Sequence, residues 1–209
     1  MGAEANCKIT IKGKTVTGKV RLETDVLHLR GGDVKLSIPF KKMKNVSARG
    51  GCLELTGPGG AVSIAVGDPM AAKWVQKILH PPSRMQKLGA RPDWRVSVVN
   101  IDDEDFVKEL ERAAASVSKG RVAANSDAIF VGATDASQLE KLTRLKQSLR
   151  PDGAIWVVRP KGRPEISEAA VMAAGKAAGL VDVKVVSFSP THTAEKFVIP
   201  VKDRDSWIS

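Results

Sequence analysis

The sequence predicts two domains, a small α+β domain followed by an α/β domain, and two observations carry this prediction. Residues 7–80 alternate short β-rich runs with glycine-rich breaks and end in one amphipathic helix, whereas residues 95–203 alternate strand and helix patterns. The length of 209 residues also suits two small domains, at about 100–200 residues per domain. The expected boundaries are 1–80, a linker with a lead-in helix over 81–94, 95–203, and a tail over 204–209.

Seven short runs in the first domain have the spacing of consecutive hairpins in a small barrel or sandwich. Apolar residues recur at nearly every second position, for example Ile9 and Ile11, which is typical of strands with one buried face. The runs are Lys8–Lys12, Thr15–Arg21, Val26–Arg30, Val34–Ile38, Asn45–Arg49, Cys52–Thr56 and Ala61–Val66.

A single helix is predicted after these strands, over residues 68–79. Asp68 suits the N-cap and Pro69 the first helical position, and an apolar stripe that includes Trp74 and Ile78 follows at helical spacing. The Pro81-Pro82 pair ends the helix, because proline cannot continue one. This helix therefore packs one face on the strands.

Seven strands and a C-terminal helix resemble the pleckstrin-homology-like fold, in which the helix closes an open barrel end. The segment Ile-Pro-Phe-Lys-Lys-Met-Lys-Asn-Val (38–46) and the helix start at 67–69 are similar to bacterial pleckstrin-homology-like and GRAM-like domains. Phosphoinositide-binding members of that fold use basic residues on the first two strands and their loop. The resemblance thus implies an anion-binding set here, formed by Lys12, Lys14, Lys19 and Arg21.

Positive charge is concentrated in the first third of the chain. The net charge is +10, and residues 1–80 hold 13 basic and 6 acidic residues, a net charge of +7. Two interpretations are open: a solvated, solubilising surface, or a surface for an anionic partner such as phospholipid, nucleic acid or an acidic protein face. Tyrosine is absent and aromatic residues make up 4%, so stacking surfaces for single-stranded nucleic acid are scarce.

Several classes of protein are not expected from this sequence. No apolar run approaches the ~20 residues of a transmembrane helix, and the N-terminus has no apolar signal core, so we expect a cytoplasmic location. Cys7 and Cys52 are too few for a disulfide framework, although a single bridge between them stays open. The three histidines lack neighbours at metal-ligand spacing, so no metal site is expected, and no nucleophile elbow or phosphate loop occurs.

The second domain reads as strands alternating with helices, which implies a mostly parallel sheet covered on both faces. The expected strands are 95–101, 117–121, 127–131, 154–159, 181–189 and 195–202. One helix spans 104–115, and another begins at Asp135 with Leu139, Leu142, Leu145 and Leu149 on one face. Ser167 suits the N-cap of an alanine-rich helix that ends at Gly179.

The order of these elements resembles a shortened class I methyltransferase fold, a Rossmann-like sheet that ends in an antiparallel hairpin. The string Leu-Arg-Pro-Asp-Gly-Ala-Ile-Trp-Val-Val (149–158) resembles the loop and strand of that fold. Together with residues 88–89, 159–162 and 178–184, it is also similar to a bacterial family, domain-of-unknown-function family three thousand and fifty-two. Extended over the whole second domain, residues 83–203, that resemblance covers 121 of the 209 residues, and it implies no activity.

The turn after the first strand of this sheet argues against the usual cofactors. Dinucleotide binders and methyltransferases have glycines there, but residues 98–106 contain none. Asp102, Asp103, Glu104 and Asp105 crowd the next helix start, where helix capping explains them better than acid–base catalysis and where they repel phosphate. We therefore predict no cofactor: NAD, FAD and nucleotides are disfavoured, and the missing glycines leave little room for S-adenosylmethionine.

Polar side chains are nevertheless expected to converge at the carboxyl edge of the sheet, where ligands bind in such folds. Two interpretations are open: a site for a small anion or polar metabolite, or solvated loops. The candidate ligand-binding residues are Asn100, Asp102, Thr134, Lys161, Arg163, Thr191, His192 and Thr193.

These observations favour a non-catalytic two-domain protein of bacterial type. It would act as an interaction scaffold with an unknown protein partner, or as a sensor of a small ligand, and no catalytic residue is predicted. The alternative is a basic module that binds an anionic membrane surface or nucleic acid through residues 1–80. The third hypothesis is an S-adenosylmethionine-dependent methyltransferase with an atypical cofactor turn.

Overall fold

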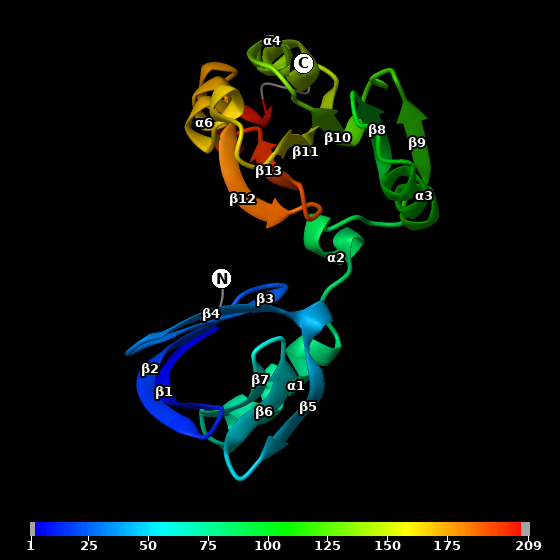
Figure 1. The fold of residues 1–209 in the computed structure, drawn as a ribbon. Helices are drawn as coiled ribbons and strands as arrows, with labels where there is room; N and C mark the ends of the chain where they lie inside the picture. The colour runs from blue at the N-terminus through cyan, green and yellow to red at the C-terminus, as the bar shows by residue number, and fades with distance from the viewer. Residues whose placement is uncertain (1–2, 206–209) are drawn as a thin grey trace. The chain divides into compact units, whose positions relative to one another are not determined.

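The computed structural model describes residues 3–205, which belong to two compact units, Met1–Ser83 and Arg84–Ser209 (Figure 1). Each unit has its own hydrophobic core. Part of the expected tail, residues 206–209, lies outside the described residues. No helix within residues 3–205 is long and apolar enough to cross a membrane.

Unit 1 is one seven-stranded antiparallel sheet that curls around its core (Figure 1). The strands are β1 (Ala3–Ile11), β2 (Lys14–Leu22), β3 (Val26–Gly31), β4 (Val34–Pro39), β5 (Lys44–Arg49), β6 (Cys52–Gly57) and β7 (Gly60–Ala65), in the order β4-β3-β2-β1-β7-β6-β5. All seven predicted strands are confirmed, although β1 begins at Ala3, upstream of the expected Lys8. The short 3-10 helix η1 (Phe40–Lys42) joins β4 to β5.

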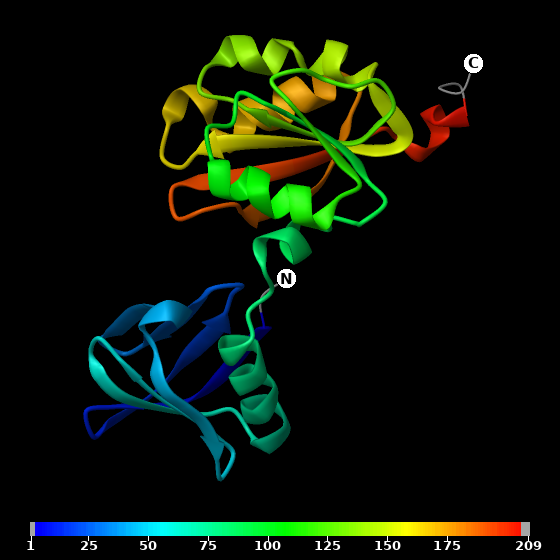
Figure 2. The same cartoon turned by 90° about the vertical axis from the view of Figure 1, so that its right-hand side faces the viewer.

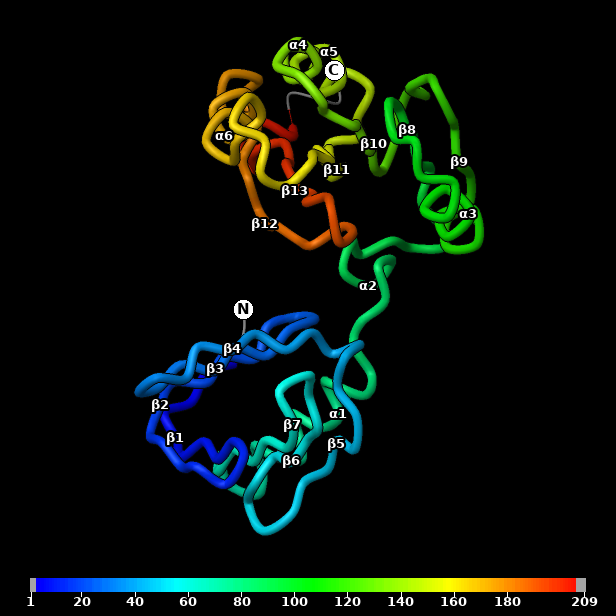
Figure 3. Tube along the Cα trace, in the orientation of Figure 1, coloured from blue at the N-terminus to red at the C-terminus, as the bar shows by residue number. Residues whose placement is uncertain are grey.

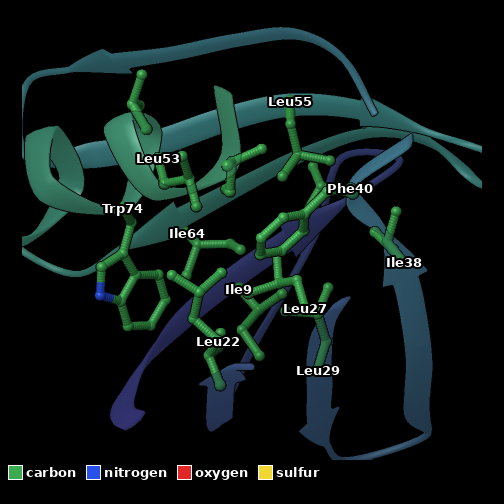
Figure 4. Packing of buried hydrophobic residues seen from close by; sticks show 14 residues of the cluster. Ile9, Leu22, Leu27, Leu29, Ile38, Phe40, Leu53, Leu55, Ile64 and Trp74 are labelled. Carbon is green, nitrogen blue, oxygen red and sulfur yellow. The ribbon is translucent and has the colours of Figure 1, made fainter. Parts of the chain in front are cut away.

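The helix α1 (Asp68–Leu79) packs its apolar stripe on β5 and β6, and the indole of Trp74 enters the core beside Ile64 and Leu22 (Figure 4). The helix lies where the sequence predicts it, but the expected N-cap was wrong. Gly67 is the N-cap at φ +88°, a left-handed conformation that glycine adopts readily, and Asp68 lies in the first turn. There its negative charge still favours the helix dipole.

Unit 2 is a six-stranded Rossmann-like α/β sheet, traced in Figure 3. Its strands are β8 (Arg95–Val99), β9 (Ser116–Lys119), β10 (Ser126–Gly132), β11 (Leu149–Pro160), β12 (Val181–Ser187) and β13 (His192–Val198), in the order β12-β13-β11-β10-β8-β9. Strands β8 to β11 pair in parallel, and β13 runs antiparallel between β11 and β12. The expected terminal antiparallel hairpin is thereby confirmed.

Helices cover both faces of this sheet (Figure 2). The helices are α2 (Arg84–Leu88), α3 (Glu104–Ala113), α4 (Ala136–Glu140), α5 (Leu142–Lys146) and α6 (Glu168–Ala177), and the short 3-10 helices η2 (Pro164–Ile166) and η3 (Val201–Asp203) follow β11 and β13. Helices α2 and α3 pack with Phe130 and Trp156 on one face. Helices α4 to α6 pack with Ile155 and Phe197 on the other. Ser167 caps α6 as predicted, since its hydroxyl accepts a hydrogen bond from the Ala170 amide.

The helix predicted from Asp135 differs from the structure. It is broken into α4 and α5, and Leu149 lies in β11, paired with Ser126, instead of on the helix. Leu149 fits the helical period with Leu145, but the Ser126 amide donates to the Ser148 carbonyl and draws the chain into the sheet. Pairing between strands therefore overrides the local helical pattern here.

Helix α6 and the sheet are held close together at Gly175. A Cβ atom at this position would lie 2.2 Å from the ring of Phe197, which is 1% exposed and has no room to move. We expect Gly175→Ala to destabilise the fold by about 1–3 kcal/mol through overpacking. Helix propensity alone predicts the opposite sign, a gain of about 1 kcal/mol. Urea unfolding measures the sign, and a stabilised variant would contradict this packing.

A buried ion pair links β11 and β13 on the α6 face. The Arg159 Nε and Nη2 atoms both lie 2.8 Å from Glu195 Oε1, and Glu195 Oε2 has no hydrogen-bond partner within the described part of the chain. Burial raises the pKa of Glu195 above its ordinary value, although the charge and hydrogen bond of Arg159 oppose this.

The raised pKa of Glu195 predicts how stability depends on pH. A carboxyl group with a raised folded-state pKa contributes stability that is complete below its unfolded pKa, about 4.3, and that is lost as pH rises through the folded pKa. Relative to Glu195→Gln, we therefore expect the wild-type free energy of unfolding to decline as the pH rises above about 4.3. Urea titrations of both proteins test this. A wild-type free energy of unfolding that rises with pH relative to that of Glu195→Gln would contradict it.

Candidate functional site

A cavity of about 480 Å³ opens at the carboxyl edge of the unit 2 sheet. It lies between the segments that follow β8 and β10, the end of β11 and the β12–β13 hairpin. Its lining residues are Asn100, Ile101, Asp102, Asp103, Gly132, Ala133, Thr134, Val158, Pro160, Phe188, Ser189, Pro190, Thr191 and His192. The size falls in the range of small-molecule sites, about 300–1,000 Å³.

Five of the eight candidate residues at this edge line the cavity: Asn100, Asp102, Thr134, Thr191 and His192. They come from three segments far apart in the chain, and the parallel arrangement of β8 and β10 brings two of these to one edge. Thr193 lies instead within β13, where it pairs with Arg159 of β11.

The two candidate cations do not line the cavity. The Lys161 ammonium donates to Ser187 Oγ at 3.1 Å and to the Ser189 carbonyl at 2.9 Å, so it holds the β12–β13 hairpin. Arg163 is exposed and precedes the short helix η2. The charged or titratable side chains of the lining are therefore Asp102, Asp103 and His192.

The turn after β8 reaches its shape without a glycine of its own. Asn100 adopts φ +55°, a left-handed conformation that asparagine tolerates better than most residues. Its carbonyl oxygen would lie 1.7 Å from a Cβ atom at Gly132, so only glycine fits at the end of β10. The glycine that the fold needs lies on the neighbouring strand, and a cavity exists where the sequence suggested little room.

Asp103 connects the cavity to helix α3. Its carboxylate accepts a hydrogen bond from the Phe106 amide at 2.8 Å and caps the helix, as expected for an acid in this cluster. Burial alone would raise the pKa of Asp103, but the hydrogen bonds from Phe106 and Arg84 and the charge of Arg84 hold this pKa below its ordinary value.

Arg84 of α2 contacts two residues of the cavity lining, Asp103 and Phe188, and two residues of helix α3, Phe106 and Glu109. Its guanidinium donates to Asp103 at 2.6 Å and to both carboxylate oxygens of Glu109 at 3.0 Å. The same group lies 5.2 Å from the ring centroid of Phe106 and 5.1 Å from that of Phe188. A bidentate, ring-stacked arginine is a fixed element, so Arg84 positions Asp103 and Phe188.

The hairpin tip is fixed by hydrogen bonds among its own residues. Ser189 Oγ accepts from the His192 amide at 3.0 Å, and His192 Nδ1 lies 2.9 Å from Thr191 Oγ1. Sequence reasoning did not select Ser189 or Phe188, because both precede the Thr191-His192 pair that marked the turn. The Ser-Pro dipeptide at 189–190 is a turn signal that would have extended the site.

A second hollow, of about 420 Å³, lies on the other side of the same turn. It shares Asn100, Ile101, Asp102 and Thr134 with the first cavity and reaches Lys119 and Gly120 at the end of β9. The turn after β8 is therefore exposed to ligand-sized space on both sides.

The basic residues predicted as an anion site in unit 1 do not form one group. Lys12 lines a separate hollow with Thr10 and Glu54, and Lys14 lies 4.0 Å from Asp33. Lys19 and Arg21, in contrast, line one hollow with His28 and Arg30.

The two cysteines of unit 1 are free thiols. Burial, and then the neighbouring Cys52, raise the pKa of the Cys7 thiol above its ordinary value. A raised pKa keeps the thiol protonated, so Cys7 is a weak nucleophile near neutral pH. Within residues 3–205, no group of three or more histidine, cysteine, aspartate or glutamate residues is placed to hold a metal ion.

No family model and no curated protein matches this chain. Among solved structures, an S-adenosylmethionine-dependent methyltransferase from Aquifex aeolicus is similar at 17% identity, covering 59% of this chain and 96% of its own, with a TM-score of 0.45. A methyltransferase of calicheamicin biosynthesis, in an SAH-bound form, is similar at 14% identity, covering 64% of this chain and 59% of its own, with a TM-score of 0.44. The C-terminal domain of an unknown protein from Leishmania infantum is similar at 12% identity, covering 37% of this chain and 82% of its own, with a TM-score of 0.31. Likeness at this level assigns neither an activity nor a ligand.

The contacts of Arg84 predict that Arg84→Met destabilises unit 2 by about 2 kcal/mol, because two carboxylates lose a shared hydrogen-bonded partner. Asp103 has a lowered folded-state pKa, so its contribution is present above its unfolded pKa, about 3.9, and is lost as pH falls through the folded pKa. The difference in the free energy of unfolding between wild type and Arg84→Met is therefore expected to become smaller below about pH 4.

Urea unfolding of the full chain at pH 7 and pH 3.5 measures both effects. Arg112→Met, an exposed arginine on α3, is the matched control and is expected to change stability by less than about 0.5 kcal/mol. An equal decrease in the free energy of unfolding for Arg84→Met and Arg112→Met would contradict the role assigned to Arg84.

Proposed function

We propose that unit 2 binds a small cationic metabolite in the cavity at the carboxyl edge and acts as a non-catalytic ligand sensor. The observation that supports this most is the charge of the lining, which has Asp102 and Asp103 but neither Lys161 nor Arg163. A carboxylate-lined cavity favours an ammonium or sulfonium group and disfavours phosphate.

The lining residues have different roles in binding the proposed ligand. Asp103 is already engaged by Arg84 and by the α3 amide, so the exposed carboxylate of Asp102 is the group available to a ligand cation. Thr134 and Thr191 offer hydroxyl groups for orientation, and Phe188 contributes an apolar wall.

The wider assignments are part of the same proposal. The strand order of unit 1 and its C-terminal helix support a pleckstrin-homology-like docking module, and the strand order of unit 2 supports a shortened methyltransferase-like domain. The resemblance to the uncharacterised bacterial family rests on the sequence strings quoted above. A scaffold role with a protein partner in the cytoplasm fits two such units. Methyl transfer is the second candidate function, favoured by ligand-sized space on both sides of the turn after β8.

S-adenosylmethionine and S-adenosylhomocysteine provide a matched test of the charge preference, since they differ by one methyl group and one positive charge. We expect saturable binding by calorimetry, tighter for the sulfonium compound by about tenfold near the Asp102 carboxylate. Asp102→Asn is expected to remove this preference. Asp105→Asn, an exposed acid in the first turn of α3 outside the lining, is expected to keep it.

Three outcomes decide between the candidates. Equal binding of both compounds, or tighter binding of anionic NADH, would contradict a cationic ligand. Absence of saturable binding by either compound would contradict this site as their binding place. Turnover of S-adenosylmethionine to S-adenosylhomocysteine by wild type, lost in Asp102→Asn, would support methyl transfer over a sensor.

A further inference from the structure

The connection from β9 to β10, residues 120–125, contains no helix, whereas α3 connects β8 to β9 and the helices α4 and α5 connect β10 to β11. Strand β10 lies beyond β8 in the sheet, so this connection passes across β8 to reach it. The Ala123 amide donates to Ser97 Oγ of β8 at 3.0 Å and holds the connection against that strand. A helix with its side chains is about 10–12 Å wide, and a single irregular segment fills less of this width. Space is therefore left between the connection and α5.

A hollow of about 400 Å³, the α5 hollow, occupies this space. Three valines form its apolar part: Val99 at the end of β8, Val122 of the connection and Val131 of β10. Val131 is buried, and Val99 and Val122 are half-buried against the same core. The other lining residues are Asn100, Gly120, Lys141, Arg144, Leu145 and Ser148. The α5 hollow shares Asn100 with the lining of the carboxyl-edge cavity and no other residue, so it is a separate place in the fold.

One face of α5 brings two cations to the α5 hollow. Residues 141, 144, 145 and 148 have the i, i+3, i+4, i+7 spacing that places side chains on one helix face. Lys141 and Gln147, on either side of α5, also have a right-handed helical backbone, so this face extends beyond the helix. Lys141 and Arg144 are exposed, and neither has a carboxylate within 4.0 Å among residues 3–205. An anion between these like charges would relieve their repulsion.

We propose that the α5 hollow binds a short-chain monocarboxylate, with the carboxylate at Arg144 and Lys141 and the apolar chain against the three valines. A guanidinium group matches the two oxygens of a carboxylate in a bidentate manner. A phosphate dianion carries a second charge, and its desolvation beside an apolar wall costs more. The volume lies near the lower end of small-molecule sites, about 300–1,000 Å³, so the chain is short. This site does not depend on the function proposed for the carboxyl-edge cavity.

The experiment titrates the full chain by calorimetry with hexanoate, a carboxylate with an apolar chain. Hexanamide keeps the chain without the charge, acetate keeps the charge with almost no chain, and inorganic phosphate supplies a dianion, all at equal ionic strength. Arg144→Gln is the test variant. Arg112→Gln removes the same charge from an exposed arginine on α3, on the opposite face of the sheet, and is the control.

We expect wild type and Arg112→Gln to bind hexanoate more tightly than the other three compounds, because hexanoate alone combines the charge with the chain. Arg144→Gln is expected to bind hexanoate about tenfold more weakly, since charge-assisted hydrogen bonds to the carboxylate are lost. The melting temperature of ligand-free Arg144→Gln is expected to equal that of wild type, because the side chain is exposed. Equal melting temperatures separate a lost site from a lost fold. In the amide spectrum of wild type, hexanoate is expected to shift residues 120–122 and 141–148.

Four outcomes would overturn the proposal. The first two are absence of saturable hexanoate binding by wild type, and binding of hexanamide, acetate or phosphate as tightly as hexanoate. The third is an equal weakening of hexanoate binding in the two arginine variants, which would show that net charge attracts the anion. The fourth is a set of amide shifts confined to residues 132–134 and 188–192, which would place hexanoate in the carboxyl-edge cavity. The comparison of hexanoate with hexanamide uses wild type alone, so it decides the question whatever the stability of the variants.

Discussion

The close approach of the Asn100 carbonyl to Gly132 is the constraint on which the candidate site depends. It requires a glycine at the end of β10 and a left-handed residue after β8, and both are present. The turn is thereby placed against the end of β10, which sets the positions of Asp102 and Asp103. Asp103 then caps α3 and binds Arg84, whose guanidinium lies over the ring of Phe106 and over the ring of Phe188, which lines the cavity.

Unit 2 has two hollows of opposite charge, which the net charge of +10 conceals. The carboxyl-edge cavity has acidic side chains, whereas the α5 hollow has the basic side chains Lys141 and Arg144. In unit 2, Lys161 serves the hairpin and not the cavity, because three acceptors of the β12–β13 turn surround its ammonium. Charge counts along the sequence therefore do not locate binding sites until contacts are known.

Local patterns in the sequence predicted most of the fold, since the seven strands of unit 1 and the alternation in unit 2 depend on periodicity and turn residues. The errors lie where tertiary pairing competes with local preference, as at Leu149, which joins a strand despite its helical spacing. Edge residues such as Thr134 were predictable from topology. Gly132 and the α5 hollow were not, because both depend on which backbone atoms and side chains face each other.

The central claim is that the carboxyl-edge cavity of unit 2 binds a cationic ligand through Asp102. The most direct measurement is the amide spectrum of the ¹⁵N-labelled full chain during titration with S-adenosylmethionine. The account predicts saturable shifts confined to residues 100–103, 132–134, 158–160 and 188–192, the segments that line the cavity. Shifts absent from these segments, or found instead among the strands of unit 1, would contradict it.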